Sequence, residues 1–176
     1  MVTARIAGRR PAGRDVEHYR TLLLEPEISE WLQPAPLPPV DENDPPSLLR
    51  RDRLHWAEHG FGPWVMSERR SGEFLGRAGL EWTSLADERV LSVSWAIVPW
   101  RWGEGLATEA GRAAIETAAE LGLAEVVSFT LPQNVASRRV MEKIGLRRAG
   151  EARHAGLPHV VYRLQLAGGR GRVAAG

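Results

Sequence analysis

The sequence contains no cysteine among its 176 residues. It therefore cannot form a disulfide framework, a thiolate metal site or a cysteine nucleophile. Any acyl transfer by this chain has to proceed without a cysteinyl intermediate.

An excess of charge of either sign is also missing, because 23 Lys and Arg are balanced by 22 Asp and Glu. No global field draws the protein to nucleic acid or to a membrane surface. A nucleic-acid binder could use the arginines at 138, 139, 147, 148, 170 and 172, but the net basicity expected of one is absent. We expect neither nucleic acid nor membrane as a partner.

Long apolar stretches are missing as well. No run approaches the ~18 residues of a membrane span, and the N-terminus lacks the hydrophobic region of a secretory signal, so we expect a cytoplasmic protein. The five histidines show no His-Glu-x-x-His spacing, and His55 and His59, one helical turn apart, lack a carboxylate or thiolate ligand of known geometry. We expect no metal.

What the sequence does contain is a strand, a glycine loop and a helix in succession from Ser92 to Leu121. The alternating, β-branched first segment ends at Pro99, which cannot donate to a β-ladder. Gly103 and Gly105 allow a tight turn, and an alanine-rich helix follows. The first N–H groups of that helix have no intrahelical partner, so the loop predicts a phosphate site, with a plain turn as the alternative. The P-loop spacing and the third glycine of a dinucleotide fingerprint are both absent.

The other predicted elements complete one domain over residues 1–166, followed by a Gly/Ala/Arg tail over 167–176 that we expect to be disordered. Strands are predicted at Thr3–Ala7, Trp64–Glu68, Phe74–Trp82, Val90–Val98, Val126–Leu131, Leu146–Ala152 and Val160–Leu166. Helices are predicted from Asp15 to before Pro26 and at Glu27–Leu32, Ser47–Glu58, Glu104–Leu121 and Asn134–Ile144, with a proline-rich loop from Pro34 to Pro46. The strand, helix and strand from Ser92 to Leu131 predict a right-handed parallel crossover.

A second motif runs from Leu131 to Gly145 and contains the last predicted helix, Asn134–Ile144. Asn134 and Ser137 are three residues apart and share a helix face, with Met141 one turn further on. The spacing permits cooperation at a ligand. It is equally consistent with a plain helix cap at Asn134 and a solvated serine in the first turn.

These motifs resemble the GNAT N-acetyltransferase superfamily, whose loop reads Gln/Arg-x-x-Gly-x-Gly/Ala. Gly105 and Ala107 match this loop and Trp102 departs from it, while the longer run from Trp102 to Ala110 resembles the Rim-type branch that acetylates ribosomal-protein N-termini. The resemblance implies an α/β (α+β) GNAT fold: a mixed, mostly antiparallel sheet of six to seven strands, splayed at a central parallel pair, with about four helices. It also implies acetyl-CoA as cosubstrate.

The resemblance carries over to individual positions. The residues expected at the pyrophosphate of coenzyme A are Trp102, Gly103, Glu104, Gly105, Leu106, Ala107 and Thr108, with free backbone groups of Ile97 and Val98 along the pantetheine arm and Asn134 nearby. Met141 replaces a tyrosine that protonates the departing thiolate in many relatives, which leaves Ser137 as the candidate. Ser92 replaces a glutamate that Rim-type relatives often carry.

On the acceptor side, the resemblance places Trp31 and Trp56 in the helices that cover the amine, with Glu81 and His154 as possible replacements for the missing base. The function that follows is acetyl transfer to a primary amine of a peptide or small molecule. A noncatalytic acyl-CoA-binding sensor or scaffold stays open, as do the identity of the amine and a monomeric or homodimeric state.

Overall fold

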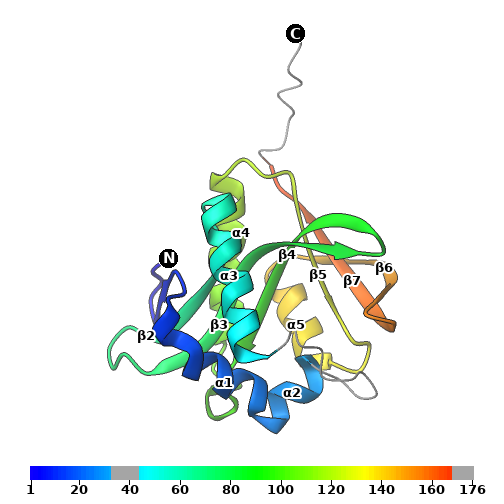
Figure 1. The fold of residues 1–176 in the computed structure, drawn as a ribbon. Coiled ribbons are helices and arrows are strands. Elements are labelled where there is room, and N and C mark those ends of the chain that lie inside the picture. The colour runs from blue at the N-terminus through cyan, green and yellow to red at the C-terminus, as the bar shows by residue number, and fades with distance from the viewer. Residues whose placement is uncertain (33–43, 168–176) are drawn as a thin grey trace.

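The computed structural model describes residues 1–32 and 44–167. A seven-stranded sheet with the strand order β1-β2-β3-β4-β5-β7-β6 is flanked by helices (Figure 1). The strands are β1 (Ile6–Arg9), β2 (Pro63–Glu68), β3 (Phe74–Leu85), β4 (Glu88–Ile97), β5 (Glu125–Thr130), β6 (Arg147–His154) and β7 (Leu157–Gln165). The helices are α1 (Val16–Leu24), α2 (Pro26–Leu32), α3 (Pro45–His59), α4 (Leu106–Glu120) and α5 (Val135–Lys143). Residues 34–43 of the predicted loop and 168–176 of the predicted tail lie outside the described residues.

Among the described strands, β4 and β5 are the pair that runs parallel, and one pair of residues joins them, Ser92 with Val127. The other neighbouring strands are antiparallel. Beyond Ser92 and Val127 the two strands make no further pairing, which leaves an opening in the middle of the sheet (Figure 1). The predicted fold is thereby confirmed, with five described α-helices where about four were expected.

A tight hairpin makes β3 and β4 longer than the sequence predicts. Ala86 and Asp87 connect these strands, and both have positive φ, 49° and 64°. Two such residues form a turn whose twist matches that of the paired strands, so pairing continues up to the turn. The predicted strand ends at Trp82 and Val90 are therefore wrong, because pairing continues to Leu85 and Glu88.

Helix α3 begins at Pro45, two residues before the predicted start. The Asp44 side chain accepts the N–H of Ser47 at 2.9 Å and caps the helix. Pro45 and Pro46 stand in the first turn, where a missing N–H leaves no bond unmade. These two prolines therefore belong to the helix and not to the proline-rich loop.

Strand β1 begins at Ile6, later than the predicted segment Thr3–Ala7. The Thr3 N–H donates to the Ile6 carbonyl at 2.9 Å, and the Ile6 N–H donates back to the Thr3 hydroxyl. This local turn takes the first residues out of the sheet.

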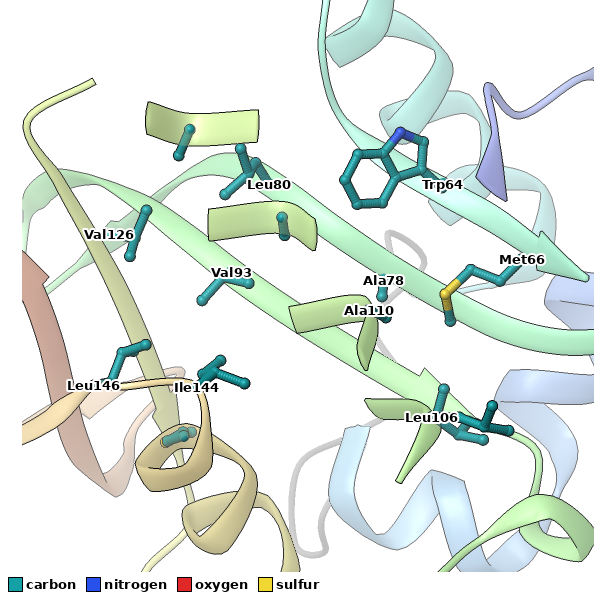
Figure 2. Packing of buried hydrophobic residues seen from close by; sticks show 14 of the residues in the cluster. Trp64, Met66, Ala78, Leu80, Val93, Leu106, Ala110, Val126, Ile144 and Leu146 are labelled. Carbon is teal, nitrogen blue, oxygen red and sulfur yellow. The ribbon is translucent and has the colours of Figure 1, made fainter. Parts of the chain in front are cut away.

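Alternation along the strands gives the sheet two packing faces. Ala78, Leu80 and Val93 join residues of α4 in the main hydrophobic core, where side chains from strands and helices point into one space (Figure 2). Arg77 and Glu81 project from the opposite face, toward α3. No helix within residues 1–32 and 44–167 is both long and apolar enough to cross a membrane.

Candidate functional site

The glycine loop, Trp102 to Thr108, presents a row of free backbone donors. Gly103 and Gly105 have φ of 81° and 79°, in the left-handed region that favours glycine. Gly105 precedes α4 without any side-chain cap, and within the described residues the N–H groups of residues 103–108 have no protein acceptor. They lie at the positive end of the α4 dipole, so the loop can bind an anion such as a phosphate.

The arginines around the loop are already paired with carboxylates. Arg5 donates to the Glu104 carbonyl at 2.8 Å and pairs with Glu109 at 2.6 Å. Arg101 pairs with Glu68, Glu73 and Glu104 at 2.9, 2.8 and 2.8 Å. Its hydrogen bonds, that with Glu104 foremost, raise the pKa of Arg101. Since both guanidiniums are paired with carboxylates, the free donors that the loop offers to an anion are those of its backbone.

Backbone groups also line the opening between β4 and β5. The Val98 N–H donates to the Leu75 carbonyl of β3 at 3.0 Å, and bonding direction alternates along an antiparallel ladder. Trp95 and Ile97 therefore direct their backbone groups to the opening. The Ile97 carbonyl accepts the Trp102 indole N–H at 2.6 Å. The expectation of a free backbone group at Val98 is corrected, because its N–H is already paired within the sheet.

A pocket of about 680 Å³, which we call the central pocket, lies over this opening. Its walls come from α1, α2, α3, five strands and the start of α5. Six residues singled out from the sequence line it: Trp31, Glu81, Ser92, Asn134, Ser137 and His154. Tertiary packing thus brings together side chains from five separate elements or their ends.

Trp56 is not among the lining residues. Its indole N–H donates to the Pro63 carbonyl at 2.7 Å, and its ring lies against Gly62, where a Cβ would fall 2.6 Å from Trp56 Cδ1. Helix α3 presents Asp52 and His55 to the pocket and turns Trp56 toward β2. The structure therefore does not bring Trp56 into the central pocket beside Trp31.

The start of α5 places two polar side chains at the pocket. Asn134 accepts the Ser137 N–H at 3.0 Å and caps the helix. The Ser137 hydroxyl lines the pocket and makes no hydrogen bond to another described residue. Met141 is 1% exposed and belongs to the main core, so it does not share the pocket with Asn134 and Ser137.

Both tyrosines of the chain bond elsewhere. The Tyr19 hydroxyl donates to Asp52 at 2.5 Å, and the Tyr162 hydroxyl donates to Glu142 at 3.2 Å. Burial, together with the charge of Asp52, raises the pKa of Tyr19. Neither tyrosine lines the central pocket, so the pocket offers no phenol as a proton donor.

A network of ion pairs surrounds Glu81. Arg77 donates to both oxygens of Asp52 at 2.6 and 2.7 Å and to Glu81 at 3.2 and 3.3 Å, and the Ser94 hydroxyl donates to Glu81 at 3.0 Å. Burial by itself raises the pKa of Glu81, but Arg77, Arg51 and Ser94 together outweigh it and lower that pKa. Glu81 is therefore ionised at neutral pH.

Sequence reasoning missed Asp52 and Arg77. A signal existed for Arg77, which is the charged residue in the otherwise apolar segment from Leu75 to Leu80. The sequence gives no such signal for Asp52, because a carboxylate between two arginines on a helix is typical of a solvated residue.

Aromatic side chains from β5, β6 and β7 form another part of the pocket wall. The rings of Phe129, His154 and His159 contact one another, with centroids 4.8 to 5.6 Å apart. Burial lowers the pKa of both histidines, so their imidazoles are neutral at pH 7. The nitrogens of His55 both bond to backbone groups. Over the described part of the chain, no cluster of three or more His, Asp or Glu could hold a metal ion.

Comparison with known proteins gives a consistent family. Residues 5–147 match the family model described as Acetyltransferase (GNAT) domain. The chain is 31% identical over 118 residues to uncharacterized protein YkkB of Bacillus subtilis, covering 64% of this chain and 69% of YkkB. It is 36% identical over 99 residues to the FsC-acetyl coenzyme A-N(2)-transacetylase of Aspergillus fumigatus, covering 49% and 39%. The solved structure of an acetyltransferase from Agrobacterium tumefaciens superposes with a TM-score of 0.79 at 28% identity, covering 93% and 92%.

Proposed function

Because the chain belongs to the GNAT acetyltransferase family, we propose that it moves an acetyl group from acetyl-CoA to a primary amine. One relative is named for acetyl coenzyme A and for transfer to a nitrogen, which supports this choice of cosubstrate and acceptor. The observation that carries the proposal is the succession of free N–H groups in the glycine loop and of β4 just before it, whose residues 92–96 line the central pocket.

The residues present fit coenzyme A. Residues 103–108 offer backbone donors to a pyrophosphate, and glycine leaves room for its close approach. Trp95 and Ile97 offer backbone groups to the amides of the pantetheine arm. A carbonyl oxygen has two lone pairs, so Ile97 can accept a second hydrogen bond beside that of Trp102.

In the proposed reaction the neutral amine attacks the thioester carbonyl carbon within a ternary complex. The new C–N bond forms, the C–S bond breaks, and the sulfur leaves as a thiolate. The nitrogen gives up one proton and the thiolate takes up one. We assign the second transfer to the hydroxyl of Ser137, which gives its proton to the thiolate and regains one from water. Met141 has no acidic proton, and both tyrosines lie outside the pocket.

We further propose that no dedicated base accepts the proton of the amine. Ser92 is not a base at neutral pH, and the lowered pKa values of Glu81 and His154 make both weak proton acceptors. The proton then leaves through water. An α-amine, with a pKa of about 7.7 to 8.0, is partly neutral already, whereas a lysine side chain at about 10.4 is not. This favours the α-amines of peptides or amino acids.

The noncatalytic alternative draws support from the same site. The positions at which relatives carry the tyrosine and the glutamate hold Met141 and Ser92 here. A sensor would bind acetyl-CoA through the glycine loop and release no acetylated product.

Mass spectrometry of amines and peptide N-termini incubated with the protein and acetyl-CoA separates the two functions. We expect the wild-type protein to form acetylated α-amines and the Gly105→Val variant to form none. Tight binding of acetyl-CoA with no acetylated product from any amine would support the sensor. A pH-rate profile on an α-amine and an alkylamine tests the base: a neutral-range inflection that disappears in Glu81→Gln or His154→Gln would contradict the water path.

A further inference from the structure

We propose that Glu81 binds the ammonium group of the acceptor and that the central pocket selects a monoamine with a flat, apolar body. The inference rests on the proposed function for the reaction that follows. The binding site itself is argued from side-chain contacts.

Glu81 retains charge and lone pairs for a ligand. Arg77 makes its shortest bonds, 2.6 and 2.7 Å, with Asp52, which is 1% exposed and also accepts the Tyr19 hydroxyl. These groups form a buried pair whose charges cancel. Arg77 reaches Glu81 only at 3.2 and 3.3 Å, and the half-exposed Arg51 stands 4.0 Å away. With 16% of its side chain exposed in the pocket wall, Glu81 can accept N–H bonds from an ammonium group.

Glu81 also lies where a reacting amine is needed. It pairs directly across from Ser92, and Ser92 pairs with Val127 at the closed end of the opening. An acyl arm anchored at the glycine loop would extend along the opening toward this end. Ser94, whose hydroxyl is bonded to Glu81, is the next residue of β4 on the same face. An ammonium group on Glu81 therefore stands beside the path of the thioester, and it attacks only after it has released one proton to water, as in the proposed function.

The aromatic part of the pocket wall suits a flat, apolar group. Phe129 and the neutral imidazoles of His154 and His159 form a contiguous aromatic surface, and Trp31 of α2 lines the same pocket. Such rings bind planar apolar groups by stacked or edge-to-face contacts.

The charge of the pocket argues against a polycation. The described lining holds two carboxylates, Asp52 and Glu81, and two guanidiniums, Arg51 and Arg77. Their charges cancel while the histidines are neutral. One ammonium group gains the contact with Glu81, whereas further cationic groups would meet Arg51.

Calorimetric titration of the full chain without acetyl-CoA tests this site. The probes are 2-phenylethylamine, ethylamine as its truncated form, 2-phenylethanol as its neutral counterpart, and spermidine as a polycation. We expect 2-phenylethylamine to bind at least about tenfold more tightly than the other three. Glu81→Gln should weaken it by about tenfold or more, and Glu81→Asp should recover part of the loss. Glu88→Gln, which removes an exposed carboxylate of β4 outside the pocket, is the matched control and should change nothing.

Equal binding by Glu81→Gln and wild type, in variants shown by thermal unfolding to be folded, overturns the proposal, and so does spermidine as the tightest ligand. Acetylation assays on the same variants keep the two proposals apart. Binding that depends on Glu81 without any acetyl transfer contradicts the proposed function and leaves this site standing. If acetyl transfer occurs and its KM for the amine is unchanged in Glu81→Gln, the proposed function stands and this binding site is contradicted.

Discussion

At the scale of single residues, the glycine loop depends on backbone conformation. Gly105 has φ of 79°, which a β-branched residue adopts only at a high cost in strain. We predict that Gly105→Val abolishes coenzyme A binding in calorimetry, because the strained loop turns its N–H groups away. Glu104→Gln should leave the affinity undiminished, since Glu104 pairs with Arg101 and contributes no positive charge. Undiminished affinity in the valine variant would place the phosphate site elsewhere.

Ser137 and Asn134 allow a second test at this scale. We predict that Ser137→Ala lowers kcat with little change in cofactor affinity, as expected for a group that acts on charge developing in the transition state. Asn134→Ala should instead weaken cofactor binding and also lose the helix cap, at a cost of about 1 kcal/mol in stability. Asn134→Asp keeps a capping oxygen and separates the two effects. Full turnover by the alanine variant at 137 would mean that water or the product ammonium protonates the thiolate.

The sequence was most informative about residues whose role follows from local geometry. The glycines of the loop and the cap at Asn134 follow from local backbone rules, and the structure has both features. Val98 and Trp56 were misplaced, because the direction of a strand's hydrogen bonds and the side of a helix that faces a pocket are decided by packing. No local pattern distinguishes Trp56 from Trp31 in this respect.

At the scale of elements, the pair Asp52–Arg77 joins α3 to β3. Arg77 is almost fully buried, so removal of its main partner leaves a charge without adequate compensation. We predict that Asp52→Ala lowers the free energy of unfolding by about 3 to 5 kcal/mol. Urea denaturation measures this change, and Glu17→Ala in the exposed pair with Arg20 is the control, with a loss below about 1 kcal/mol. A loss of that small size in Asp52→Ala would show that Glu81 takes over as counter-ion.

Element ends were harder to predict than the elements themselves. Every described strand was anticipated, because alternation and β-branched residues mark them, but two hairpins were given longer connections than they have. Ala155 and Gly156 join β6 to β7 with φ of 47° and 77°, as Ala86 and Asp87 join β3 to β4. Alanine is unusual at positive φ, so a dipeptide that begins with alanine does not predict a two-residue turn as Asn-Gly or Asp-Gly would.

At the scale of the whole molecule, stability should fall on mild acidification. Burial is the largest cause of the lowered pKa values of His55, His154 and His159. Below their ordinary pKa of 6.5 the unfolded chain binds more protons than the folded one. The stabilisation that comes from keeping these histidines neutral is complete above pH 6.5. It is lost as the pH falls from 6.5 through the lower pKa values of the folded chain. We expect the melting temperature to decrease between about pH 7.5 and pH 5.5, and less steeply in His55→Gln; an unchanged slope in this variant would show that His55 is not among the groups responsible.

The topology was predictable because strand, helix and strand in succession permit essentially one handedness of crossover. The central pocket was not, since it arises where α3, β3 and the β6–β7 hairpin meet across an opening that one residue pair, Ser92 with Val127, closes at its end. The spacing of residues along the sequence does not predict which distant elements pack together in this way.

The opening has a consequence for solubility. An unpaired strand edge normally invites pairing with another chain, which is the first step of many aggregation processes. Here the free backbone of β4 faces inward, with α4 packed on β3 and β4 and α5 packed on β5. A second protein chain cannot approach these inner edges, whereas a slender ligand can. The fold thus keeps unpaired backbone available for recognition without the hazard that exposed edges bring.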